Sequence, residues 1–246
     1  MNSDKPVGGA ISTSGSIDLR RAQDRFHTKT HWLDSWHSFS FNGHYDPANV
    51  NHGLLVVNND DVIAPGTGFP LHPHRDMEIV TWVLDGQLEH RDSTGAEGVI
   101  YPGLAQRMSA GTGVRHSEMN ASQDTPVHLI QMWVLPDTAG VTPSYQQVDV
   151  SEDLAGGGLV RIADGVGDAA LHIHQRGAVL LAGRLPPSAS AEVPDAPHVH
   201  VFIARGNAAL GDARLEAGDA ARLTRAGSLP FTAGPDGVEV LIWATD

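Results

Sequence analysis

The hydrophobic positions of this chain fall into many short runs and not into long stripes. Apolar stretches of five to nine residues are separated by turns rich in Gly, Pro, Asn and Asp. No long stretch shows the period of about 3.6 residues that marks an amphipathic helix. The pattern therefore predicts an all-β protein. The apolar stretches are residues 53–57, 78–84, 127–135, 178–182, 198–204 and 238–243.

Composition along the chain predicts two domains. Residues 1–16 are rich in Ser and Gly and poor in large apolar side chains, which is typical of a mobile amino-terminal tail. Residues 151–158 combine acidic residues with three glycines, and we expect the chain to cross between domains there. Many short strands with turn chemistry indicate a barrel or a sandwich, and closed barrels remove exposed edges. We expect two antiparallel β-barrels, at residues 17–150 and 151–246.

Two short segments carry metal-binding side chains at alternate positions. His72 and His74 form one pair, and His116 and Glu118 form the other. In a strand, residues two apart point to the same face and lie about 6.6 Å apart, so two strands can each aim a pair at one ion. Three imidazoles and a carboxylate suit a divalent transition metal such as iron, copper, nickel, manganese or zinc.

Chance histidine pairs must be set against this interpretation, because the chain holds 14 histidines in 246 residues. Two further pairs occur, His172 with His174 and His198 with His200. Neither pair is followed by a second motif with a histidine and a carboxylate. We therefore expect these four residues to be surface or packed histidines.

The glycines around the first two segments favour a site over a chance pair. Gly66 and Gly86 flank the first pair at the spacing of the first cupin motif, and Gly113 precedes His116 as at the end of the second. Glycine is needed where strands turn tightly at the rim of a barrel. The spacings thus predict a metal site within a cupin-type barrel.

The carboxylate of the site is displaced from its usual place. The usual cupin motif has it five residues after the second histidine, where this chain has Ile79. Glu78 lies one position early, so it would point to the opposite face unless a bulge restores its aim. Glu118 lies two residues after His116 and shares its face. We expect Glu118 to be the ligand and keep Glu78 as the alternative, or as a buried hydrogen-bond acceptor.

An internal repeat predicts that the second half lacks a metal site. Gly86 of the first half finds a counterpart in Gly206, and later Gly-containing turns recur at comparable intervals. The positions that match the three histidines hold Glu192, Pro194 and Thr232. The second barrel therefore keeps the scaffold without the ligands.

Three stretches resemble the pirin family, some bacterial members of which are described as quercetin 2,3-dioxygenases. They read HPHRDMEIVTWVLDGQLEHRDSTG, MSAGTGVRHSEMN and VHLIQMWVLPDTAGVTPSYQQ, and the likeness is detailed over residues 27–147. The resemblance implies a bicupin fold, with the metal held by His72, His74, His116 and Glu118. It agrees with the carboxylate position inferred from spacing.

The resemblance also implies a metal-dependent dioxygenase that cleaves flavonols such as quercetin, an aromatic, enolic substrate, with dioxygen. One divalent transition metal per chain is expected, Fe(II) first and Cu, Ni, Mn or Zn as alternatives. A deprotonated enol can bind an open metal position, and Glu118 is placed to take the proton. Two alternatives stay open, because cupin barrels host many chemistries. One is a non-catalytic, metal- and redox-responsive regulator that acts through a protein partner, and the other is a cupin enzyme acting on another enol or a catechol.

Charge and composition exclude several partners. The net charge of −13 and the absence of a Lys/Arg cluster argue against direct binding of nucleic acid. No apolar run is long enough to predict a membrane span. The start of the chain has no pattern of a secretory signal, and the chain has no cysteine. We therefore expect a cytoplasmic location.

Overall fold

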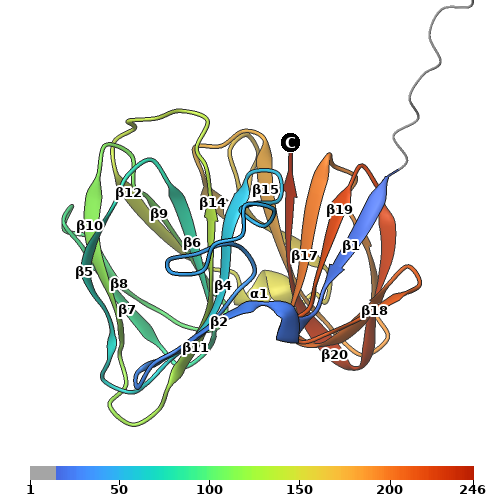
Figure 1. The fold of residues 1–246 in the computed structure, drawn as a ribbon, viewed down its shortest axis with the longest axis horizontal. Helices are drawn as coiled ribbons and strands as arrows, with labels where there is room; N and C mark the ends of the chain where they lie inside the picture. Colours follow the sequence, from blue (N-terminus) through green and yellow to red (C-terminus); the bar gives the residue numbers. More distant parts are fainter. Residues whose placement is uncertain (1–14) are drawn as a thin grey trace, which may run out of the picture.

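Two β-rich halves lie side by side in the computed structural model, which describes residues 15–246 (Figure 1). The prediction of an all-β protein is confirmed, since helix within residues 15–246 is confined to a 3-10 turn, η1 (Ala22–Asp24), and one short helix, α1 (Ser151–Leu154). Helix α1 occupies the expected crossing between the halves, where it buries Leu154. No helix in the described part of the chain is long and apolar enough to cross a lipid bilayer.

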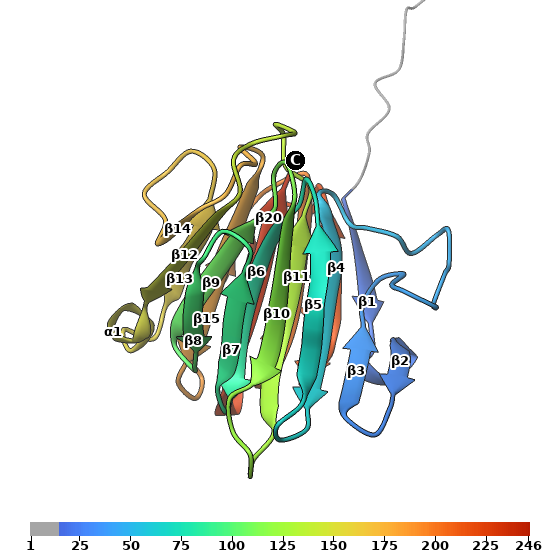
Figure 2. The same ribbon diagram turned by 90° about the vertical axis from the view of Figure 1, so that its left-hand side faces the viewer.

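The first half consists of two facing sheets. The larger contains β2 (Phe26–Lys29), β3 (Leu33–His37), β4 (Leu55–Ile63), β6 (Glu78–Asp85), β9 (Leu104–Ser109), β11 (Val127–Val134) and β12 (Ser144–Asp149). Its order is β12-β9-β6-β11-β4-β3-β2. The smaller contains β5 (Gly68–His74), β7 (Leu88–Asp92), β8 (Glu97–Ile100) and β10 (Val114–Asn120), in the order β5-β10-β7-β8 (Figure 2).

The barrel of the first half is not closed by hydrogen bonds. The two sheets remain separate ladders and are held together by side chains between them. Ile63 and Val83 of the larger sheet pack there with Leu88 and Ile100 of the smaller one. The sequence predicts alternating strands correctly, but apolar packing and not strand pairing completes this barrel.

The second half forms one sheet of nine strands. These are β1 (Ser16–Arg20), β13 (Leu159–Asp164), β14 (Leu171–His172), β15 (Ala178–Leu185), β16 (Ser190–Val193), β17 (His198–Leu210), β18 (Ala213–Glu216), β19 (Ala220–Thr224) and β20 (Leu229–Thr245). The long strands β17 and β20 pair with each other and each pairs with further strands, and bulges shift their mutual register. Gly86 and Gly206, matched by the sequence repeat, both have positive φ, at 77° and 73°.

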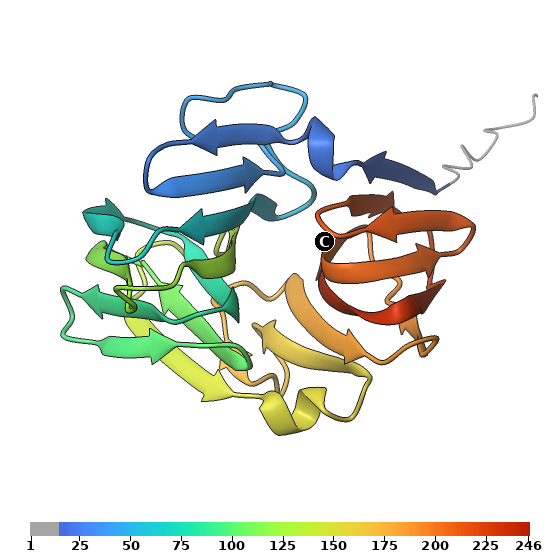
Figure 3. The same cartoon turned by 90° about the horizontal axis from the view of Figure 1, so that it is seen from below.

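The amino-terminal strand belongs to the second half. Strand β1 pairs antiparallel with β19, and Figures 1 and 3 show this blue strand beside the red strands of the carboxy-terminal half. The expected first domain began at residue 17, so its residues 17–20 lie in the other sheet. The expected tail ended at residue 16, but Ser16 already pairs in β1, and residues 1–14 lie outside the described residues. Leu19 packs on the core of the second half, which explains the placement.

The larger sheet of the first half is covered on both faces. Val80 and Trp82 of β6 join a core shared with Trp243 of the second half. The alternate residues Thr81 and Val83 face the interior of the first half, where Val83 joins its core. Because both faces of β6 are buried, its sequence is an almost continuous apolar run.

Candidate metal centre

Three imidazoles converge at the pairing of β5 with β10. His116 lies directly opposite His72 in the antiparallel register. The ring centroids are 4.4 Å apart for His72 and His116, and 4.9 Å apart from His74 to each of the other two. One ligand atom from each histidine lies within 4.8 Å of those of the others. The structure thus brings together the three histidines that the spacing predicts, on two adjacent strands.

Glu118 lies next to this group but is held by other residues. Its two carboxylate oxygens accept hydrogen bonds from Gln131 Nε2 at 3.0 and 2.8 Å, and Thr81 Oγ1 lies 3.5 Å from Oε1. Its ligand atoms converge with those of His116 and His90, and not with those of all three predicted histidines. A register shift between His116 and Glu118 in the pairing with β5 accompanies this arrangement.

His116 is oriented by a chain of hydrogen bonds through His90. His116 Nδ1 lies 3.4 Å from His90 Nδ1, and His90 Nε2 lies 3.2 Å from Asp92 Oδ2. Since the carboxylate accepts the proton of His90 Nε2, His90 Nδ1 is left as the acceptor for His116 Nδ1–H. His116 Nε2 then carries a free lone pair, and this buried atom has no hydrogen-bond partner in the described part of the chain. Such an arrangement is typical of a metal-binding histidine.

His72 also has a free ring nitrogen, and burial favours the neutral form of His74 and of His116. His72 Nδ1 donates to the backbone carbonyl of Pro70 at 2.8 Å, which leaves its Nε2 free. Burial, followed by the nearby His116 and His72, lowers the pKa of His74 to about 4. Burial, followed by His72 and His90, lowers the pKa of His116 to about 3. Neutral imidazole is the form that binds metal ions.

Gly68 allows β5 to approach β10 at the site. A Cβ atom on Gly68 would lie 2.2 Å from the backbone oxygen of Glu118 and 2.6 Å from the Cα of Met119. Real side chains do not reach these distances, so any other residue must push the strands apart. The glycine therefore sets the spacing that places Glu118 beside the imidazoles.

A cavity of about 540 Å³ opens beside the imidazoles in the first half. His72, His74 and Glu118 line it, together with the aromatic side chains of Phe41 and Trp133. The size and the mixture of apolar walls with a few polar groups are typical of a site for a small organic molecule. Another part of the cavity wall, on β3 and β4, carries polar side chains.

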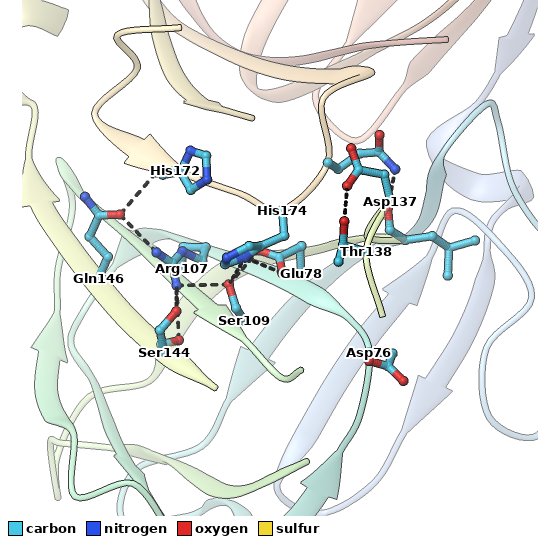
Figure 4. A network of polar contacts seen from close by, with 12 residues as sticks. Asp76, Glu78, Arg107, Ser109, Asp137, Thr138, Ser144, Gln146, His172 and His174 are labelled. Atoms are coloured by element: carbon cyan, nitrogen blue, oxygen red, sulfur yellow. Dashed lines mark hydrogen bonds and ion pairs between the residues drawn. The ribbon is translucent and has the colours of Figure 1, made fainter. Parts of the chain in front are cut away.

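Glu78, the alternative carboxylate, lies away from the site. Its side chain is buried between the halves, where it accepts a hydrogen bond from Ser109 Oγ at 2.7 Å and lies 3.3 Å from His174 Nδ1 (Figure 4). Arg107 continues this network by donating to Ser144 Oγ at 2.7 Å. Glu78 is thus a buried acceptor and belongs to no convergent group of ligands in the described residues.

The two remaining histidine pairs do not form ligand groups among residues 15–246. His172 is exposed, and His174 reaches the network of Glu78. His198 Nδ1 lies 3.1 Å from the backbone oxygen of Asp246. His200 is buried beside Phe39, and neither of its ring nitrogens has a partner.

Sequence reasoning missed His90 and Gln131. Gln131 interrupts an otherwise apolar run in the strand after the second motif, and a lone amide in such a run is a signal that could have been used. His90 and Asp92 also alternate, but nothing in their spacing shows that β7 lies next to β10. The sequence pattern does not show which strands, distant along the chain, become neighbours in the sheet.

Comparisons with known proteins agree with this architecture. The chain matches the pirin family over residues 19–134 and the quercetinase C-terminal cupin domain over residues 162–243. A relative in Mycobacterium tuberculosis, whose name gives quercetin 2,3-dioxygenase activity only provisionally, is 55% identical over 94% of this chain and 95% of its own. The quercetin 2,3-dioxygenase of Escherichia coli is 46% identical over 65% of this chain and 68% of its own.

Solved structures show the same relationship over nearly the whole chain. The structure of YhhW from Escherichia coli has a TM-score of 0.88 at 36% identity, and it covers 94% of this chain and 98% of its own. The structure of the same bacterial pirin in complex with nickel(II) has a TM-score of 0.87, with 94% and 99% covered. The predicted bicupin architecture is therefore confirmed, and the chain belongs to the pirin family.

Proposed function

We propose that this protein is a metal-dependent dioxygenase that cleaves flavonols such as quercetin, with the reaction in the first half. The observation that carries the proposal is the buried, unpartnered Nε2 of His116, which lies among two further imidazoles. Leaving such an atom without a partner costs free energy, and a bound cation would remove that cost. The names of the relatives support the reaction type.

The residues that would hold the ion are His72, His74 and His116, with Glu118 as the fourth ligand or as a neighbouring base. Three imidazoles suit a divalent transition metal and leave positions open for other groups. Fe(II) is the first candidate that the family resemblance implies. Nickel(II) is the practical ion for first tests, because the complex with the Escherichia coli pirin contains it.

A bound divalent ion would supply a positive charge that stabilises the anion of a flavonol deprotonated at its enolic hydroxyl. Glu118 is placed to accept the proton of that hydroxyl at one of its carboxylate oxygens. Gln131 donates to both oxygens and so holds the carboxylate in a fixed orientation. Trp133 Nε1 donates to Gln131 Oε1 at 3.1 Å, which in turn fixes the amide.

The aromatic walls of the cavity would position the flat rings of a flavonol and exclude water. Trp133 contacts His74 edge to face, with the ring centroids 4.9 Å apart, so it lies directly beside the imidazole group. Phe41 also contacts Trp133 edge to face, with the ring centroids 5.6 Å apart. Aromatic side chains supply apolar area with a defined geometry, which suits a rigid aromatic substrate.

The proposed reaction is tested with the Glu118→Gln variant. Glutamine keeps the size and one oxygen but removes the charge and the base, while the three imidazoles remain. Turnover of quercetin should fall roughly 10²–10⁴-fold, as for loss of a positioned general base. The measurement is oxygen uptake with protein of known metal content.

Glu78→Gln is the matched control, since Glu78 is an equally buried carboxylate outside the site. It should leave turnover nearly unchanged. Undiminished oxygen uptake in metal-loaded Glu118→Gln protein would exclude Glu118 as the base. If wild-type protein loaded with iron, nickel, copper or manganese consumes no oxygen with any flavonol, the proposed reaction is wrong.

A further inference from the structure

A row of polar side chains crosses the larger sheet of the first half. The five residues are directly opposed in register on β3, β4, β11, β6 and β9, and all are buried. Directly opposed residues of antiparallel strands point to the same face, here the interior. The row is His37, Asn59, Gln131, Thr81 and Gln106.

This row is unusual for the interior of a β-barrel. Four residues further along the same strands, Leu33, Ile63 and Val127 are opposed in the same way and form apolar core. Burying polar side chains costs free energy unless they gain partners. The polar row therefore needs a reason other than packing.

Two members of the row contact the carboxylate of Glu118, and two others line the cavity. Gln131 and Thr81 contact Glu118. His37 and Asn59 line the cavity on the opposite side from the imidazoles. Gln106 contributes nothing to the cavity wall.

The hydrogen bonds of this wall leave donors and acceptors free. His37 Nδ1 donates to Asn59 Oδ1 at 2.9 Å, so the amide NH₂ of Asn59 keeps its protons for another partner. Ser35 Oγ donates to Asp61 Oδ1, and no residue in the described part of the chain donates to Asp61 Oδ2. Ser35 and Asp61 also line the cavity. The wall thus offers an amide donor beside a carboxyl group.

We propose that Asn59 and Asp61, held by His37 and Ser35, bind the hydroxyl groups of the substrate ring that points away from the three imidazoles. The chemical class is an aromatic ring with adjacent hydroxyls, as in a catechol. Each hydroxyl can both donate and accept a hydrogen bond, which matches an amide donor next to a carboxyl group. This inference rests on the proposed function, because the enolic end of the flavonol is taken to face the imidazoles.

The protonation of Asp61 suits this role. Burial raises the pKa of Asp61 to about 7, and the hydrogen bond from Ser35 opposes this effect. Near neutral pH the carboxyl group is therefore neutral in part of the molecules and can donate as well as accept. A charged carboxylate in the cavity would be less suited to a neutral phenol.

The test compares the binding of two flavonols to nickel-loaded protein without oxygen. Quercetin carries a catechol ring, and galangin is the flavonol that lacks both of those hydroxyls. Isothermal titration calorimetry should show that wild-type protein binds quercetin roughly tenfold more tightly, as expected for hydrogen bonds to buried polar groups. In Asn59→Leu this ratio should fall to about one, through loss of quercetin affinity.

Gln106→Met is the matched control, since it removes a buried amide from the same row outside the cavity. It should keep the wild-type ratio. Where turnover is measurable, Asn59→Leu should raise KM for quercetin more than KM for galangin. An unchanged binding ratio in Asn59→Leu, or equal binding of both flavonols by wild-type protein, would overturn the inference. Selective binding without oxygen uptake would instead refute only the proposed reaction.

Discussion

Single residues orient the three imidazoles and the neighbouring carboxylate of Glu118. The alternation of His72 with His74, and the position of His116, predict that these three side chains meet, because residues two apart share a face of a strand. Glu118, the fourth predicted ligand, converges with His116 and His90 instead. The alternation does not predict the role of His90 on a third strand, β7, whose Nδ1 accepts the proton of His116 Nδ1. It also does not predict that Gln131 holds Glu118. These partners depend on which strands become neighbours, and local spacing carries no information on that.

The residue His90 gives a prediction for metal affinity. In His90→Phe the aromatic volume is kept but His116 Nδ1–H loses its acceptor, so His116 is no longer held with Nε2 free. Loss of such a partner typically lowers metal affinity 10–100-fold. Competition with a chromogenic chelator measures the affinity for nickel(II).

Two other histidine variants serve as controls for complete loss and for full retention of the ion. His74→Ala should lose the ion altogether, as elemental analysis would show. His198→Ala removes a histidine of the second half and should retain about one ion per chain. A His90→Phe protein with wild-type affinity would mean that His90 does not orient His116, and a second ion lost with His198 would contradict a single site.

The buried carboxyl group of Asp61 predicts a pH dependence of stability. Its pKa is about 7 in the folded protein, raised first by burial, against 3.8 in the unfolded chain, while Ser35, Asp60, Glu118 and His128 act on it with smaller effects. Between these values the folded state binds more protons, so the free energy of unfolding falls as the pH rises from about 4 to about 7. Asp61→Asn should remove this loss, worth up to about 4 kcal/mol.

Urea denaturation of the wild type and the variant at each pH gives the difference that isolates Asp61. The gain in stability of Asp61→Asn over wild type should grow from pH 4 to pH 7 and then level off. Asp153→Asn, which changes an exposed carboxylate of α1, should show no such trend. A constant difference across the range would show that Asp61 ionises normally in the folded protein.

At the scale of elements, register is what turns the strands into a site. The turn chemistry and apolar runs predict most strands, and the alternation within β5 and β10 predicts their inward faces. The polar row across five strands is not visible in the sequence, because its members are spread from His37 to Gln131 and only strand pairing aligns them. For a similar reason the sequence predicts the cupin-type barrel of the first half but not that side-chain packing, and not strand pairing, joins its two sheets.

The close approach of β5 to β10 predicts the effect of a side chain at Gly68. In Gly68→Val the new side chain meets the backbone at Glu118 and Met119 and must displace one strand. We expect a loss of stability of about 1–3 kcal/mol, as for overpacking, together with a clear loss of metal affinity. Thermal unfolding and elemental analysis measure the two effects. Gly95→Val, at an open turn position with φ of 90°, should lose some stability from backbone strain but keep the metal.

At the scale of the whole molecule, the two halves share a hydrophobic core, and the amino-terminal strand β1 joins the sheet of the second half. Trp82 of the first half donates through Nε1 to Glu239 of the second at 2.9 Å, and Trp243 Nε1 lies 3.2 Å from the sulfur of Met132. The sequence repeat predicts two related halves but not this shared interface. The expected domain boundary at residue 17 places most of β1 in the first half, because the sequence does not show that the partner of β1 lies about 200 residues further along the chain.

The placement of β1 predicts the effect of amino-terminal truncation. Removal of residues 1–20 would expose the edge of β19 and part of the apolar surface that Leu19 covers. The melting temperature should fall by several degrees, and the protein should associate at high concentration, because a free edge can pair with another chain. Scanning calorimetry and light scattering measure these effects. A chain shortened only by residues 1–14, which keeps β1 whole, is the comparison against which the effect of losing β1 is measured.

The pairing of β1 with β19 also has a consequence for synthesis on the ribosome. Residues 16–20 leave the ribosome about 200 residues before their partner, residues 220–224. Until β19 has been made, the strand that carries Ile17 and Leu19 has no partner strand. The two sheets of the first half can already form during this time. The nascent chain therefore carries an unpaired strand until β19 has been made, and the second sheet gains this strand late in synthesis.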